Sequence, residues 1–258
     1  MAFVCTLSSG SSGNSVLVSH GGTHLLIDAG ITRRRLTAAL GAWGLVIADI
    51  SAVLVTHEHT DHTSGLPFLS CPVYTGMGTA GYLAFRRPEL DVRELCDYSP
   101  FEIGHVGVEP FPVPHDAPDT LGFLLYMGSK TACLCTDAGH ASPDVLRACA
   151  MADYLMLEAN HDEDMLRGGR YPAMLKKRIM GPRGHLSNTL SAEIALAAAQ
   201  SRASRLTLCH LSKDNNTPEL AYSAVAAGLS SAGVCPGRDI ELDIAPRLEP
   251  GLPWGDFS

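Results

Sequence analysis

Short apolar segments alternate with polar and glycine-rich turns along the whole chain. Segments of this kind predict β-strands, because strands are short and their ends are marked by turn-forming residues. The strands predicted in this way lie at residues 3–7, 15–19, 24–28, 53–56, 72–74, 106–113, 121–127, 131–135, 154–157, 206–209 and 240–244.

Other segments repeat apolar residues every three or four positions, which predicts amphipathic helices. These helices lie at residues 33–46, 77–85, 144–151 and 189–200, and shorter ones begin near residues 65 and 217. Strand-rich blocks are followed by helices twice, and no linker divides the chain. The pattern therefore indicates a mixed α and β chain forming one domain over residues 1–245. Residues 246–258 carry three prolines and are expected to form a loosely ordered tail.

The composition is that of an ordinary soluble globular protein, with 46% hydrophobic and 18% charged residues. A net charge of −8 argues against nucleic-acid binding by the whole surface. One segment departs from this balance, because residues 167–183 contain six basic residues and no acidic one. We interpret it as a possible phosphate-binding segment, and a solvated helix face is the alternative.

The sequence also bears on targeting, on membrane association and on the redox state of the cysteines. The first residues lack a basic region followed by an apolar run, and no apolar stretch approaches the roughly 20 residues that span a bilayer. With eight cysteines and no visible export signal, we expect reduced thiols, a cytoplasmic protein and no membrane partner.

The strongest chemical signal follows the predicted strand at 53–56, where three histidines and an aspartate lie within six residues. Imidazoles and carboxylates are ligands of divalent transition metals. Because residues i and i+2 of an extended chain project to the same side, His57 and His59 can bind one metal. Asp61 and His62, a turn further on, can face a second. The HExxH zinc-protease motif does not apply, since the third histidine falls at position 62. A solvated histidine-rich turn is the alternative.

The arrangement His57-x-His59-x-Asp61-His62 resembles the signature of the metallo-β-lactamase superfamily. Two-metal members of that superfamily also need a histidine, a bridging aspartate and a last histidine, and His115, Asp137 and His210 follow in this order after β-like stretches. The resemblance implies one metal held by His57, His59 and His115, a second held by Asp61, His62 and His210, and Asp137 between them.

The same resemblance implies further properties. The cofactors would be two divalent metal ions, Zn²⁺ or Mn²⁺. Asp28 and Asp116 would lie behind the metal ligands, and Asp28 would accept a hydrogen bond from a ligand histidine and fix its tautomer. A turn that ends the strand is the alternative for Asp28. The fold would be of the α+β class, a single-domain four-layer αββα sandwich with the metals at one edge; periodicity alone gives only a mixed α and β chain.

Two more segments, at residues 157–162 and 184–188, resemble motifs of the phosphodiesterase branch of the superfamily, which includes tRNase Z. By that match Glu158 orients His185, which protonates the leaving oxygen, and we count Asp61, Glu158 and His185 as the catalytic residues. A carboxylate beside a histidine raises the histidine pKa and keeps a proton available near neutral pH. A structural role for His185 at the start of a helix is the alternative, and His161 is the second choice for the acid.

Taken together, the segments at residues 8–15, 157–162, 184–188 and 210–216 resemble the WalJ/YycJ family, and the resemblance covers nearly the whole chain except its tail. It implies 5′-to-3′ exonuclease activity on double-stranded DNA. The expected partner is therefore DNA, at ends or gaps of a duplex, with RNA as a second choice and the oligomeric state left open. The residues expected to contact substrate are Ser11, Asn14, His161, Arg170, Lys176, Lys177, Arg178, Lys213 and Asn216.

Three alternatives stay open at this point. The first is a phosphodiesterase for small molecules such as cyclic nucleotides, which would be favoured if the 167–183 segment faced away from the metals. The second is an RNA-processing hydrolase similar to tRNase Z, although neither an extended tRNA-holding arm nor room for a long insertion is evident. The third is a regulatory protein that binds metal without turnover, against which the seven-ligand set counts, since structural sites normally close with four ligands.

Overall fold

Two seven-stranded sheets form the centre of the molecule in the computed structural model, which describes residues 2–256. In spatial order, the first sheet contains β14 (Trp254–Asp256), β1 (Ala2–Ser8), β2 (Ser15–His20), β3 (Thr23–Ile27), β4 (Ala52–Leu54), β5 (Val73–Gly76) and β6 (Val92–Leu95). The second contains β13 (Glu241–Ile244), β12 (Arg205–Cys209), β11 (Tyr154–Glu158), β10 (Lys130–Cys135), β9 (Leu121–Met127), β8 (Val106–Pro112) and β7 (Phe101–Ile103).

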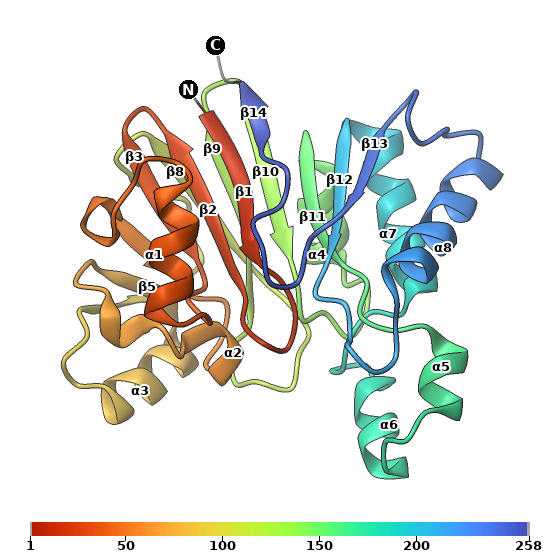
Figure 1. Ribbon diagram of the computed structural model, residues 1–258, viewed down its shortest axis with the longest axis horizontal. Coiled ribbons are helices and arrows are strands. Elements are labelled where there is room, and N and C mark those ends of the chain that lie inside the picture. The colour runs from red at the N-terminus through yellow and green to blue at the C-terminus, as the bar shows by residue number, and fades with distance from the viewer. Residues whose placement is uncertain (1, 257–258) are drawn as a thin grey trace.

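Helices cover the outer face of each sheet (Figure 1). The helices on the first sheet's side are α1 (Arg33–Gly41), α2 (Thr60–Thr63) and α3 (Met77–Arg86), with 3₁₀ turns at Ile47–Asp49 and Leu66–Phe68. Those on the second sheet's side are α4 (Pro143–Ala150), α5 (Glu163–Gly168), α6 (Ala173–Ile179), α7 (Asn188–Ser201) and α8 (Pro218–Ser231). The expected four-layer αββα sandwich in a single domain is confirmed.

Three layers of buried side chains hold these four layers together. The central one lies between the sheets and includes Leu54 of the first sheet and Phe123 of the second, both with no exposed surface. The outer ones pack α1 through Leu36 and α7 through Ile194. Because strands of both sheets are buried on two faces, their sequences are nearly continuous apolar runs, which is why they were recognisable.

Strand direction brings the site residues to one edge. Strands β3 and β4 are parallel, and so are β10, β11 and β12. Strand β8 also runs parallel to β10, since both are antiparallel to β9. The carboxyl ends of parallel strands meet at the same edge of a sheet, and the loops that follow these strands carry the candidate ligands.

Several local expectations were wrong. The tail is ordered at its end, because β14 pairs antiparallel with β1 and the ring of Trp254 stacks 4.8 Å from that of Tyr154; residues 257–258 lie outside the described part. Helix α1 ends at Gly41 instead of residue 46, shortly before Gly44, whose φ of 70° ends helical geometry. Strands β6 and β7 were missed, since both are short, lie at sheet edges and are half exposed.

Within residues 2–256, none of the helices is both long and apolar enough to cross a membrane.

Candidate metal centre

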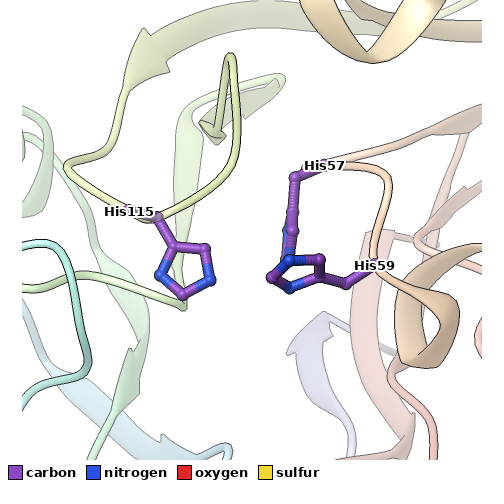
Figure 2. Close-up of side chains that lie close together, drawn as sticks. All are labelled: His57, His59 and His115. Carbon is purple, nitrogen blue, oxygen red and sulfur yellow. The ribbon is translucent and has the colours of Figure 1, made fainter. Parts of the chain in front are cut away.

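Three histidines form the first group of candidate ligands. His57 and His59 lie in the loop after β4, and His115 lies in the loop after β8. Their ligand atoms all lie within 4.8 Å of one another. Figure 2 shows the imidazoles of His57 and His59 facing that of His115 across a common space. The geometry suits one metal ion held by three nitrogens.

A second group of candidate ligands lies beside the first and consists of Asp61, His62 and His210, again within 4.8 Å of one another. Asp137 lies between the two groups. Its Oδ2 is 3.5 Å from Nε2 of His62, and its Oδ1 is 3.9 Å from Nε2 of His115. The structure thus brings together all seven residues that the resemblance implied, although their role as ligands stays a prediction.

The protein contacts Nδ1 of four of the candidate histidines. Nε2 is left for a metal in His57, His115 and His210, whereas Nε2 of His62 also lies 3.1 Å from Nδ2 of Asn14. In each case Nδ1 meets a protein oxygen: Thr56 Oγ1 for His57 at 3.0 Å, Asp28 Oδ2 for His62 at 2.6 Å, Gly184 O for His115 at 3.0 Å and Glu158 Oε1 for His210 at 2.8 Å. A hydrogen bond at Nδ1 of this kind fixes the tautomer in metal sites.

Several buried atoms at the centre have no hydrogen-bond partner among residues 2–256. They are Nε2 of His57, His115 and His210, and Oδ2 of Asp137. A buried polar atom without a partner costs about 1–3 kcal/mol, so four such donor atoms in one place are the arrangement that a metal-binding site requires. Nitrogen and carboxylate donors suit Zn²⁺ or Mn²⁺, and the residues therefore fit the two divalent ions that the fold family implies.

The backbone is strained at three of the corners that carry these side chains. Asp28, Asp137 and His210 have φ values of 58°, 58° and 55°, and each follows a strand closely. Residues other than glycine rarely adopt this left-handed conformation, which costs about 1–3 kcal/mol and is found mainly where function requires it. The sharp corners turn Asp137 and His210 into the site and Asp28 behind His62.

Charge and burial set the protonation of the metal-free site. Burial, together with the neighbouring histidines, lowers the pKa of His57 well below its ordinary value, so this ring is neutral. Burial also lowers the pKa of His62, but Asp28 and Asp137 outweigh it and raise the pKa to about 9. For Asp61, burial is outweighed by His210 and His62, which hold its pKa well below the usual range.

Glu158 connects the metal centre with the candidate acid. Its Oε1 accepts hydrogen bonds from Nδ1 of both His185 and His210, each at 2.8 Å. Its Oε2 accepts from the backbone N–H groups of Ala138 at 3.0 Å and Leu186 at 3.1 Å. Burial would raise the pKa of the Glu158 carboxyl, but these two histidines hold it well below the usual range. At His185 burial lowers the pKa, and Glu158 outweighs it and raises the pKa above its ordinary value.

A pocket of about 240 Å³ opens above the candidate ligands. His185, whose side chain is 22% exposed, forms part of its wall together with Ser11, Asp116 and Arg178. The guanidinium of Arg178 pairs with Asp116, whose Oδ1 lies 3.2 Å from Nε2 of His115. Asp116 thus connects the basic helix α6 to the candidate ligands, but it meets the nitrogen of His115 that faces the candidate metal site, while Nδ1 meets Gly184 O, so it does not lie behind this ligand as expected.

The remaining predicted substrate contacts divide into two groups. Arg170, Lys177 and Lys213 are exposed but do not line the pocket, and Nζ of Lys176 donates to the carbonyl of Arg167. Asn14 is buried, with Nδ2 3.1 Å from Nε2 of His62, so it supports the centre from inside.

Two further expected substrate contacts, like Asn14, lie inside the protein. The predicted substrate contact at Asn216 was wrong, because its side chain is buried and exchanges hydrogen bonds with Asn188, which leaves it no access to substrate. His161 is 2% exposed and lines a smaller pocket that it shares with His185.

Three residues at the centre were not singled out from the sequence. Thr56 contacts Nδ1 of both His57 and His62 through its hydroxyl, and Asn160 and Tyr171 line the pocket. Thr56 directly precedes the histidine motif, and Asn160 lies between Glu158 and His161, so adjacency to the motifs was the available signal.

Comparisons with known proteins agree with this geometry. Residues 23–211 match the Beta-lactamase superfamily domain. The chain is 33% identical to the exodeoxyribonuclease YycJ of Bacillus anthracis over 94% of this chain and 95% of that protein. It is also 33% identical to the exodeoxyribonuclease WalJ of Streptococcus pneumoniae over 93% of each. The crystal structure of the metallo-β-lactamase fold protein YhfI of Bacillus subtilis matches with a TM-score of 0.73 at 17% identity, covering 98% of both chains. The chain therefore belongs to the metallo-β-lactamase superfamily, and the exodeoxyribonucleases YycJ and WalJ are among its relatives.

Proposed function

We propose that this protein is a metal-dependent phosphodiester hydrolase that degrades double-stranded DNA from its ends in the 5′-to-3′ direction. The observation that carries the proposal is the pair Glu158–His185 on the wall of the metal pocket. Hydrolysis of a lactone or thioester gives this pair no obvious task, whereas a DNA ester expels an alkoxide that must be protonated. The names of the two relatives support the same activity.

The candidate ligands have separate tasks in this proposal. His57, His59 and His115 hold one divalent ion, Asp61, His62 and His210 hold the other, and Asp137 lies between them. When bound, the two ions, Zn²⁺ or Mn²⁺, supply an activated water nucleophile and offset the charge that develops on the phosphoryl oxygens. Thr56, Asp28 and Glu158 keep the histidine rings in the orientation that binding requires.

His185 completes the reaction by moving a proton. Nδ1 donates to Glu158, so when the ring is protonated its second proton is on Nε2, from which it passes to the leaving oxygen. The carboxylate beside it keeps the pKa of His185 above its ordinary value, so the ring is protonated over more of the neutral range.

The position of the basic segment favours DNA over a small phosphodiester. Helix α6 forms one wall of the metal pocket through Leu175, Arg178 and Ile179 instead of facing away from it. Arg170 and Lys177 are exposed nearby in sequence and can meet the phosphates of a longer strand.

All eight cysteines are free, in keeping with a reducing compartment such as the cytoplasm.

The test uses three substrates and one substitution at the metal centre. The purified protein is assayed on 5′-labelled duplex DNA, a cyclic nucleotide and a lactone, with Zn²⁺ and Mn²⁺ each supplied. We expect the duplex to be degraded, with nucleotides released one at a time from the 5′ end. Asp137→Ala is expected to abolish turnover and to lower the metal content toward one ion per chain. Two ions retained with near-normal turnover would contradict the two-metal centre, and turnover of the lactone alone would contradict the nuclease.

A further inference from the structure

A second pocket, of about 570 Å³, lies on the outer side of the loop that carries the candidate ligands. Thr60 and Thr63 of α2 line it on one side, and Tyr82 and Phe85 of α3 line it on the other. Helix α2 therefore presents Asp61 and His62 to the metal centre and its other face to this pocket. Figure 1 shows α3 and the basic helix α6 on opposite sides of the strand ends that carry the centre.

Helix α3 exposes large aromatic side chains toward solvent. Phe85 is 84% exposed and Tyr82 is 44% exposed, whereas Ala80 and Leu83 of the same helix are buried. The two rings lie one turn apart on the helix and form a small apolar patch, and exposed apolar patches rimmed by polar residues are typical of binding surfaces.

The charges beside these rings are positive. Arg86 and Arg87 line the same pocket, and no carboxylate of residues 2–256 forms an ion pair with either. Other arginines, such as Arg93, Arg147 and Arg202, are each paired with an acidic residue, so the charges of Arg86 and Arg87 are not offset in this way. The acidic residue that lines the pocket is Glu58, whose carboxylate already accepts a hydrogen bond from Thr79.

We propose that this surface of α3 binds the strand that is not hydrolysed, as single-stranded bases at the end of the duplex. This inference rests on the proposed function and names the path of the second strand. In this inference one strand enters the pocket of about 240 Å³ beside α6, and the terminal base pairs separate so that the other strand leaves by a different route. The α3 pocket offers that route directly behind the metal loop, with rings for stacking of bases and two free guanidinium groups for phosphates.

Two multiple variants test the proposal, with one matched control. Tyr82→Ala combined with Phe85→Ala removes the stacking surface, and Arg86→Gln combined with Arg87→Gln removes the charges. Tyr222→Ala is the control, because Tyr222 of α8 is 41% exposed and lies outside both pockets. Hydrolysis of bis(p-nitrophenyl) phosphate by each preparation gives its content of working centres, to which duplex degradation is normalised.

The direct readout is a duplex with 2-aminopurine near the 3′ end of the strand that is not hydrolysed. We expect its fluorescence to change on binding to the unmodified protein and to the control. Loss of both rings is expected to weaken duplex binding by about 5- to 160-fold for each base that stacks on them, and to abolish the fluorescence change. Loss of both arginines is expected to reduce the slope of log K against log salt by about 1.4, since each single-strand contact contributes about 0.7.

Unchanged duplex affinity and fluorescence in both variants would overturn this inference while leaving the nuclease in place. A concentration-dependent dimer in sedimentation that Phe85→Ala dissociates would also overturn it, because a second copy of the chain would then cover α3. If the unmodified protein hydrolyses bis(p-nitrophenyl) phosphate but neither binds nor degrades DNA, the proposed function itself fails.

Discussion

Replacing Glu158 by glutamine tests the central hydrogen-bond network. The side chain is fully buried, and each of its two oxygens accepts two hydrogen bonds. All four partners are N–H donors: two are imidazoles, of His185 and His210, and two are backbone amides. A glutamine keeps one oxygen and replaces the other by an NH₂ group, so in either orientation two donors face another donor.

The magnitude follows from this count. Each buried donor left without an acceptor costs about 1–3 kcal/mol, so Glu158→Gln is expected to lower the free energy of unfolding of the metal-free protein by about 2–6 kcal/mol at neutral pH. The pKa of Glu158 is depressed in the folded state, so the stabilisation by its carboxylate is present above the ordinary glutamate pKa and is lost as the pH falls through the folded value. The difference between the two proteins should therefore shrink on acidification.

The assay is denaturant unfolding of both metal-free proteins at several pH values, with metal content measured after reconstitution. Glu89→Gln is the control, because Glu89 is exposed and its replacement should change the unfolding free energy by less than about 0.5 kcal/mol. We also expect the pKa of His185 to fall in the Glu158 variant. If the variant unfolds like the control, retains both metals and leaves the pKa of His185 unchanged, Glu158 does not hold the centre together.

Other substitutions probe the acid, the basic segment and the backbone of the site. His185→Ala should retain both metals and slow DNA hydrolysis by about 10²–10⁴, with much of the rate recovered on bis(p-nitrophenyl) phosphate, whose phenolate leaves without a proton; equal losses on both substrates would point to a structural role. Neutralising Arg170 and Lys177 should weaken duplex binding at all sequences alike and reduce the salt slope by about 1.8, and an unchanged slope would make them a solvated helix face. Gly30→Ala would push a methyl group into the backbone of the metal loop and should lower the free energy of unfolding by about 1–3 kcal/mol. Gly41→Ala is the control, because its methyl group meets open space and should not destabilise the protein. Equal effects of the two variants in denaturant unfolding would contradict the close packing at Gly30.

Most strands and their ends could be predicted from the sequence, because buried strands are apolar runs and the candidate ligands follow them directly. What a local pattern cannot show is which loops face one another. The acceptor shared by His185 and His210 depends on β11 lying beside β12, and this pairing joins segments about 50 residues apart. Asn216 illustrates the same limit, since it follows His210 closely in sequence but packs inward against Asn188.

The shared carboxylate constrains how such a centre can change. One oxygen of Glu158 binds both the candidate acid and a candidate ligand, so neither histidine can move without disturbing the other. The strained corners at Asp137 and His210 restrict the backbone in the same way. Helix α6 is held less tightly: its direct connection to the centre includes the pair of Arg178 with Asp116, and much of its surface is exposed. Substrate preference can therefore be altered at the helices around the pocket while the reacting groups keep their geometry.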